Sequence, residues 1–121
     1  MFPNKVDTFV GSKKFIKKLT ALVFSSITYM RGIFPENAYM INELGGRQLK
    51  VLTGSYTNHN AYLMIRWLKS AFEALDRNYM RQLIFEILDQ KNTPIEYYSV
   101  DFSYKGDEVT CSLASGTQTE K

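Results

Sequence analysis

The sequence has few of the residues from which metal sites and thiol chemistry are built. Its 121 residues include one cysteine, Cys111, and one histidine, His59. A single cysteine excludes an intrachain disulfide, and this pair cannot supply the ligand cluster of a zinc site. We interpret Cys111 as a small strand residue rather than a reactive thiol, and His59 as a polar residue near the start of a helix.

Enzyme motifs are also missing. The chain has no G-x-S-x-G nucleophile turn, no phosphate-binding P-loop and no dinucleotide-binding G-x-G-x-x-G. The pair Gly45-Gly46 we interpret as a turn. Glu86 lies in an apolar run, where we expect its carboxylate to face outward or to be hydrogen-bonded. We therefore predict a protein that is not an enzyme and that has no cofactor and no metal.

Long apolar runs are absent as well. No stretch has the length that crosses a bilayer, and residues 1–5 contain no apolar signal-peptide core, so we expect no membrane partner and a cytosolic or nuclear location. Eight Phe, eight Tyr and one Trp, with 45% hydrophobic and 22% charged residues, are enough to form one buried core. The composition is therefore that of a single globular domain.

Two segments have helical periodicity. The first runs over about 12–31, with Ser12 as the N-cap, Gly32 in the left-handed conformation after the last turn, and Pro35 preventing resumption. The second runs from Asn58 or Asn60 to about Tyr79. Apolar residues at helical spacing predict one buried stripe on each helix. The stripes are Phe15, Leu19, Leu22, Val23, Ser26, Ile27 and Met30, and Ile65, Leu68, Phe72, Leu75 and Tyr79, widened by Trp67 and Ala71.

The periodicity changes after the second helix. The nearly continuous apolar run at 83–88 predicts a strand over 82–88 that is covered on both faces. Alternating residues predict a half-buried strand over 95–104, a tight turn over 105–108 and a further strand segment over 109–113. A short strand is also expected at 49–52. This order of elements predicts an α+β fold with helices packed on one face of an antiparallel sheet.

Basic residues cluster at the start of the first helix. Lys13, Lys14, Lys17 and Lys18 occupy its first two turns, in a chain with a net charge of +3. Cations at this end oppose the helix dipole and repel one another at i,i+4. We consider two interpretations: a contact with nucleic-acid phosphate or an acidic partner, and a solvated face that keeps the protein soluble.

Three segments carry a family pattern. Residues 26–36 are Ser-Ile-Thr-Tyr-Met-Arg-Gly-Ile-Phe-Pro-Glu, residues 65–79 begin Ile-Arg-Trp and continue through Phe-Glu-Ala-Leu, and residues 96–104 are Glu-Tyr-Tyr-Ser-Val-Asp-Phe-Ser-Tyr. In this order they resemble the HORMA domain family, in particular its meiotic chromosome-axis branch. The helix end matches the family pattern Tyr-x-Arg-Gly-(Ile/Leu)-(Phe/Tyr)-Pro. The resemblance implies a partial HORMA domain over 12–113, between an N-terminal extension (1–11) and a polar tail (114–121).

The resemblance also implies a mode of action. HORMA domains are non-enzymatic adaptors that wrap a C-terminal segment, the safety belt, around a short partner peptide, the closure motif. The peptide adds to the sheet as an edge strand. Meiotic members assemble on chromosome axes in the nucleus by binding such motifs in axis proteins or in other HORMA proteins, and an AAA+ remodeller opens them. They support homolog pairing, synapsis, recombination and checkpoint signalling.

The chain ends at Lys121, whereas the family fold continues through further strands and the safety belt. We therefore expect the C-terminal part of the fold to be missing and peptides to exchange quickly. Arg31 is a candidate contact near the peptide path, with a role in holding the helix end as the alternative. A second hypothesis is a small basic module that binds nucleic acid or another partner and keeps the HORMA scaffold without a working safety belt.

Overall fold

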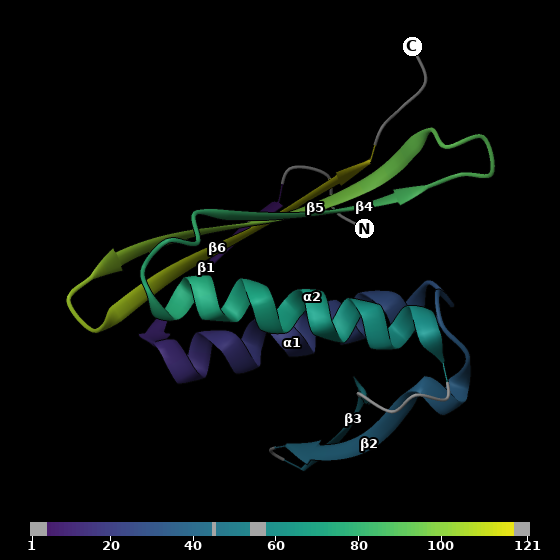
Figure 1. Ribbon diagram of the computed structural model, residues 1–121, viewed down its shortest axis with the longest axis horizontal. Helices are drawn as coiled ribbons and strands as arrows, with labels where there is room; N and C mark the ends of the chain where they lie inside the picture. Colours follow the sequence, from purple (N-terminus) through teal and green to yellow (C-terminus); the bar gives the residue numbers. More distant parts are fainter. Residues whose placement is uncertain (1–4, 45, 54–57, 118–121) are drawn as a thin grey trace. The chain divides into compact units, whose positions relative to one another are not determined.

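The computed structural model describes residues 5–44, 46–53 and 58–117, and its elements are labelled in Figure 1. In chain order they are β1 (Lys5–Ser12), α1 (Lys13–Met30), the 3-10 helix η1 (Glu36–Ala38), β2 (Tyr39–Leu44), β3 (Arg47–Leu52), α2 (His59–Asp76), β4 (Gln82–Leu88), β5 (Pro94–Lys105) and β6 (Glu108–Thr117). The predicted α+β class, with two long helices and an antiparallel sheet, is confirmed. The chain divides into two compact units, residues 1–16 with 75–121 and residues 17–74.

The first unit is built on a four-stranded antiparallel sheet with the strand order β1-β6-β5-β4. The long strand β5 pairs with β4 on one side and with β6 on the other. The β5–β6 hairpin turns through Gly106 and Asp107, where Gly106 has a φ of 61°. A side chain is disfavoured at that φ, so the predicted tight turn depends on this glycine.

The two central strands alternate as predicted. Tyr98, Val100 and Phe102 of β5 and Val109 and Cys111 of β6 are buried on one face of the sheet. Burial, together with the negative charge of nearby Asp101, raises the pKa of the Cys111 thiol to about 11. The thiolate is the reactive form, so Cys111 is a strand residue of the core, as expected.

The prediction that β4 is covered on both faces is wrong. Ile84 is 53% exposed and Leu88 is 46% exposed, whereas Leu83 is buried. Within the described residues β4 pairs only with β5 and forms an edge of the sheet. An apolar run without polar alternation suggested a central strand, but here the apolar residues on one face lie at the surface. Glu86 is also exposed, as expected.

The sheet extends beyond the expected domain limits at both ends. Residues 5–12, most of which were predicted to be an N-terminal extension, form β1 and pair with β6 from Lys5↔Ser115 to Ser12↔Glu108. Residues 114–117, predicted to be part of a polar tail, continue β6. Each of these strand segments contains a glycine at a position with no room for a side chain. A Cβ at Gly11 in β1 would lie 2.5 Å from the Phe15 ring, and a Cβ at Gly116 in β6 would lie 2.6 Å from the Tyr97 hydroxyl. Glycines of this kind weaken a strand signal in the sequence.

Both long helices begin at the predicted caps. The Phe15 N–H donates to Ser12 Oγ (3.1 Å), and the Ala61 N–H donates to Asn58 Oδ1 (2.9 Å). Each bond satisfies one of the first-turn N–H groups that have no partner within the helix. The start of each helix is therefore fixed by a residue close to it in the chain.

The helix ends and the first hairpin turn use left-handed residues. Gly32, with a φ of 64°, follows α1 as predicted. The second helix ends at Asp76 rather than near Tyr79, because Asn78 adopts a φ of 61° and its N–H donates to the Leu75 carbonyl (3.0 Å). Of the predicted turn at 45–46, Gly46 has a φ of 81° between β2 and β3, and residue 45 lies outside the described residues.

Of the predicted buried stripe of α1, Ile27 is buried, but the rest of the buried face is shifted by about one position. The buried residues are Ile16, Thr20, Phe24, Ser25, Ile27 and Thr28. Phe15 and Ser26 are exposed, and Met30 is 72% exposed. Apolar periodicity missed this face because three of its members carry hydroxyl groups. On α2, Leu68, Ala71 and Leu75 are buried as predicted, whereas Tyr79 is exposed beyond the helix end and Trp67 is 42% exposed, packed against Phe24 at a centroid distance of 6.1 Å.

In the second unit the β2–β3 hairpin lies against α1 (Figure 1). The Tyr39 hydroxyl donates to Thr28 Oγ1 (2.8 Å), Thr28 Oγ1 donates to the Ser25 carbonyl (3.0 Å), and the Leu52 N–H donates to Ser25 Oγ (3.1 Å). Ala38, Tyr39, Leu52 and Ala61 form an apolar cluster around these bonds, with Phe34, Met64 and Ile65 packed against it. The predicted strand at 49–52 is part of β3, but its partner β2 was not predicted, because Asn42 and Glu43 interrupt its apolar pattern.

We predict that Thr28 and Tyr39 are energetically coupled. Thr28→Val keeps the shape but leaves the buried Tyr39 hydroxyl without its acceptor, which should lower the free energy of unfolding by about 1–3 kcal/mol. Tyr39→Phe should cost less, because Thr28 keeps its bond to Ser25. The double variant should cost less than the sum of the two single changes. Equilibrium urea unfolding measures all four proteins, and strictly additive costs would contradict the coupling.

Candidate functional site

The four lysines at the start of α1 do not act as one group. Lys13 Nζ donates to the backbone carbonyl of Asp76, the last residue of α2, at 3.0 Å. Carbonyls at a helix C-terminus lack helical partners and carry partial negative charge. Lys13 therefore caps α2, which offsets its unfavourable place at the start of α1. No sequence pattern indicated this contact, because the two residues are far apart along the chain.

The other predicted site residues lie along α1 and just after its end. Lys14 and Lys18 are exposed and lie one helical turn apart, whereas Lys17 is half-buried. Arg31 is exposed just after the end of α1, and its backbone N–H donates to the Ile27 carbonyl (3.0 Å). A helix rises 1.5 Å per residue, so Arg31 lies about 20 Å along the axis from Lys18. The structure thus leaves Lys14 and Lys18 as an exposed cationic pair and does not bring Arg31 to it.

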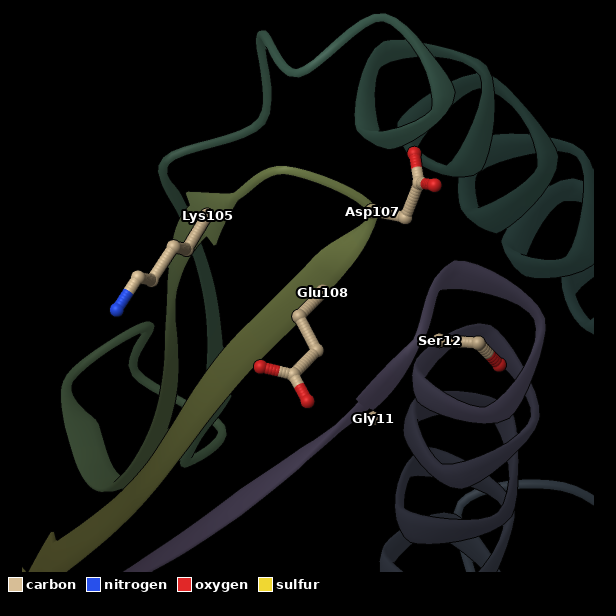
Figure 2. Close-up of a pocket in the computed structure, with 5 residues that line it drawn as sticks. All are labelled: Gly11, Ser12, Lys105, Asp107 and Glu108. Carbon is tan, nitrogen blue, oxygen red and sulfur yellow. The ribbon is translucent and has the colours of Figure 1, made fainter.

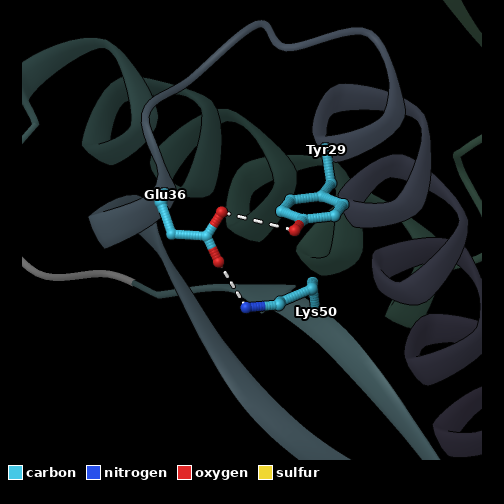
Figure 3. Close-up of polar contacts among 3 residues, drawn as sticks. All are labelled: Tyr29, Glu36 and Lys50. Carbon is cyan, nitrogen blue, oxygen red and sulfur yellow. Dashed lines mark hydrogen bonds and ion pairs between the residues drawn. The ribbon is translucent and has the colours of Figure 1, made fainter.

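A second group of charged residues was not predicted (Figure 3). The Glu36 carboxylate accepts a hydrogen bond from the Tyr29 hydroxyl (3.3 Å) and forms an ion pair with Lys50. The hydrogen bond from Lys50 lowers the pKa of Glu36, and Glu36 in turn raises the pKa of Lys50. Lys50 Nζ also lies 5.4 Å from the centroid of the Tyr29 ring. The charges of Glu36 and Lys50 neutralise each other, so the group connects α1, η1 and β3 instead of binding an ion.

The first unit has an open pocket of about 500 Å³ at the β5–β6 hairpin, lined by Gly11, Ser12, Lys105, Asp107 and Glu108. Figure 2 shows that the side chains do not converge: Lys105 points away from the two carboxylates, and Glu108 and Asp107 point in different directions. Over the described residues, no three His, Cys, Asp or Glu side chains gather as metal ligands. In the same residues, no helix has the length and apolar character to cross a membrane.

The outer edge of β4 offers backbone groups for binding. The Phe102 N–H donates to the Arg81 carbonyl (2.9 Å), and the register continues through Gln82↔Asp101 and Leu83↔Val100. In an antiparallel ladder, residues that bond to the neighbouring strand alternate with residues that do not. Arg81, Leu83 and Phe85 therefore direct their N–H and C=O groups toward β5. Ile84 and Glu86 direct theirs outward, where no described strand pairs with them.

The side chains of this outward row are also accessible. Ile84, Glu86 and Leu88 lie on the exposed face of the sheet. The opposite edge strand, β1, is less suited to accept a strand, because Gly11 lies within it. We therefore take the β4 edge, defined by the outward groups of residues 82–88, as the candidate site.

The sequence of the chain is similar to those of known proteins. Residues 12–121 match the HORMA domain family. HORMA domain-containing protein 1 of Rattus norvegicus is 32% identical over 124 residues, and HORMA domain-containing protein 2 of Mus musculus is 32% identical over 130 residues. The alignments cover 100% and 99% of this chain but only 32% and 42% of those proteins. The chain thus spans a third to two fifths of the length of these relatives.

Solved structures show the same fold. HTP-2 of C. elegans bound to the HIM-3 closure motif aligns with a TM-score of 0.66 and 20% identity, covering 77% of this chain and 42% of that one. A chain of the mitotic checkpoint complex aligns with a TM-score of 0.62 and 15% identity, covering 75% and 49%. At such identities the similarity shows the fold alone.

Proposed function

Since the chain belongs to the HORMA domain family, we propose that it is a non-enzymatic adaptor of meiotic chromosome axes that binds closure-motif peptides of partner proteins. Its relatives include the HORMA domain-containing proteins 1 and 2, and the HTP-2 structures contain closure motifs of HIM-3 and HTP-3. The partners we propose are closure motifs in axis proteins or in other HORMA proteins, with an AAA+ remodeller that opens the complex. The expected location is the nucleus, on chromosomes.

The proposal rests on the family match over residues 12–121 and, within the described residues, on the outer edge of β4, with which no described strand pairs. A peptide that adds there as a strand can accept from the N–H groups and donate to the C=O groups of Ile84 and Glu86. Main-chain bonds of this kind supply affinity for an extended segment, and exposed side chains beside them supply selectivity. On a chromosome axis, such capture would hold the chain in place, where we expect it to support pairing, synapsis, recombination and checkpoint signalling.

The β4 edge also bears on how quickly a bound peptide should dissociate. No described residue covers the outer side of β4, so strand pairing alone would hold a peptide that binds there. Differences in affinity between related complexes arise mainly in the dissociation rate. We therefore expect residues 1–121 to bind closure motifs weakly and to release them quickly.

The edge variant Ile84→Pro tests this directly. Proline removes the outward N–H of Ile84 but no bond to β5, so the β4–β5 ladder should persist. Ile84→Thr is the matched control, because it changes the side chain and keeps the N–H. Using surface-bound HIM-3 or HTP-3 closure-motif peptides, we expect Ile84→Pro to abolish or strongly weaken binding and Ile84→Thr to weaken it slightly. Equal binding by both variants, with an unchanged circular dichroism spectrum, would show that the peptide binds elsewhere.

The exposed lysine pair favours a second candidate function, a basic module that binds nucleic acid or an acidic partner on the HORMA scaffold. Lys14 and Lys18 are exposed one turn apart, and no described acidic side chain pairs with them. Lys13 does not belong to this surface, since it caps α2. Two cations are a small footprint, so any affinity for DNA should be modest and strongly dependent on salt.

We predict that the double variant Lys14→Gln/Lys18→Gln weakens DNA binding and lowers the slope of log K against log salt by about 0.9 for each phosphate that is no longer neutralised. The control Lys69→Gln/Lys105→Gln changes the net charge equally but alters exposed lysines on α2 and β5. Fluorescence anisotropy of a labelled duplex across a salt series measures both. Identical slopes for the two double variants would mean that Lys14 and Lys18 form a solvated face without a nucleic-acid role.

A further inference from the structure

We propose that the start of α1 and the segment after α2 together form a surface that binds single-stranded DNA. Two exposed aromatic rings of this surface stack on unpaired bases, and the lysines and arginines beside them neutralise phosphates. The inference rests on the second candidate function, because it assigns the basic module a class of nucleic acid that fits its expected place on chromosomes. The basic–aromatic surface consists of Lys14, Phe15, Arg77, Tyr79 and Arg81, all of which lie in the first unit.

One hydrogen bond places the two segments side by side. Lys13 Nζ donates to the Asp76 carbonyl at 3.0 Å, across 63 positions of the sequence. Lys14 and Phe15 follow Lys13 directly, and Arg77 follows Asp76 directly. The bond therefore brings together a lysine-rich segment and an arginine-containing segment that the sequence keeps far apart.

The positive charge of the chain is concentrated in these two segments. Residues 13–18 and 76–81 contain six of the 15 basic residues and one of the 12 acidic residues. The remaining sequence has more acidic than basic residues, so the net charge of +3 comes entirely from these segments. Lys14, Arg77 and Arg81 are all exposed. A local excess of accessible cations attracts a polyanion, because each phosphate that is neutralised releases counterions.

Two aromatic rings are exposed among these cations. Phe15, next to Lys14 in α1, is 47% exposed, and Tyr79, between Arg77 and Arg81 in the sequence, is 72% exposed. Apolar periodicity gave no indication of this, because it predicted that both rings are buried. In a DNA duplex the bases stack on one another, whereas unpaired bases can stack on aromatic side chains while nearby cations hold the backbone. The two rings therefore favour a single strand over a duplex.

Both rings are attached to backbone that the fold holds in place. The Phe15 ring lies against Gly11 of β1, where a Cβ would be 2.5 Å from the ring atom Cδ2. The carbonyl of Met80, the residue after Tyr79, accepts a hydrogen bond from the Tyr104 hydroxyl of β5 (2.5 Å). A surface that is ordered before binding loses less conformational entropy when it binds a ligand.

Acidic residues limit the surface on one side. Asp107 and Glu108 line the pocket beside Ser12 (Figure 2), and Glu108 pairs with Ser12 at the end of the β1–β6 ladder. Their carboxylates repel phosphate. We therefore expect the DNA to contact the basic–aromatic surface without extending over the β5–β6 hairpin.

The experiment titrates a short labelled oligothymidine, and a labelled duplex of the same length, with the whole chain and follows fluorescence anisotropy. We expect the single strand to bind more tightly than the duplex. Phe15→Leu/Tyr79→Leu removes both rings at constant charge, so it should weaken single-strand binding about fivefold or more and leave duplex binding unchanged. The control Phe15→Tyr/Tyr79→Phe keeps both rings and should bind like the unaltered chain. Should the leucine double variant not fold, Tyr79→Leu alone gives the same comparison.

A second pair of variants tests the cations across a salt series. Arg77→Gln/Arg81→Gln should weaken single-strand binding and lower the slope of log K against log salt by about 0.7 for each phosphate that is no longer neutralised. Arg47→Gln/Lys91→Gln removes the same charge from exposed positions outside the surface and should change the affinity less. Equilibrium urea unfolding checks that each variant is folded.

The outcomes separate this inference from the candidate function on which it rests. If the arginine variant weakens binding but the leucine variants do not, the surface binds DNA through its cations and the preference for a single strand is wrong. If both charge variants weaken binding equally, the effect is net charge and the inference also fails. If neither form of DNA binds, the nucleic-acid function itself fails. Polyglutamate that displaces the oligothymidine as well as unlabelled oligothymidine does would identify an acidic protein as the partner and overturn the choice of DNA.

Discussion

An open β-sheet has two edges, and the N–H and C=O groups along them need partners outside the sheet. Among the described strands, β5 lies in the interior of the ladder, with β4 on one side and β6 followed by β1 on the other. The constraint leaves β4 with outward groups at alternate residues while its inward groups hold it to β5. Alternate residues of β4 thus hold the strand to β5, and the residues between them direct their N–H and C=O groups outward. That division is what allows an edge to bind a peptide without disrupting the sheet.

In the second unit, hydrogen bonds from hydroxyl groups hold the β2–β3 hairpin in place on α1. The β2–β3 hairpin has only two strands, and hairpins of that size are marginal by themselves. Its attachment to α1 depends on hydroxyl groups of the helix, Ser25 and Thr28, which meet the Leu52 N–H and the Tyr39 hydroxyl. At the surface, the Glu36–Lys50 ion pair adds little stability but joins the segment after α1 to β3. The buried hydrogen bonds fix the position of the hairpin on α1, and burial of the apolar cluster around them stabilises this packing.

Features that depend on local chemistry could be predicted from the sequence. The caps Ser12 and Asn58, the left-handed Gly32 and the alternation along β5 and β6 depend on residues close together in the chain, and the structure confirms them. Features that depend on distant partners were missed. The buried face of α1 contains Thr20, Ser25 and Thr28, whose hydroxyls find partners only in the folded chain, so apolar periodicity chose the neighbouring face. Lys13 was grouped with its lysine neighbours, whereas in the folded chain it donates to the Asp76 carbonyl. The apolar run of β4 indicated burial, but its exposed residues lie on a strand whose outer side pairs with no described strand.

The central claim is that β4 is the strand to which a peptide adds, and amide hydrogen exchange tests it most directly. In the free chain, the outward N–H groups of Ile84 and Glu86 should exchange quickly, while those of Leu83 and Phe85, bonded to β5, should exchange slowly. A saturating closure-motif peptide should slow Ile84 and Glu86 to the level of their neighbours and leave the β1 amides unchanged. Protection that appears along β1, or nowhere in the sheet, while the peptide is bound would contradict the claim.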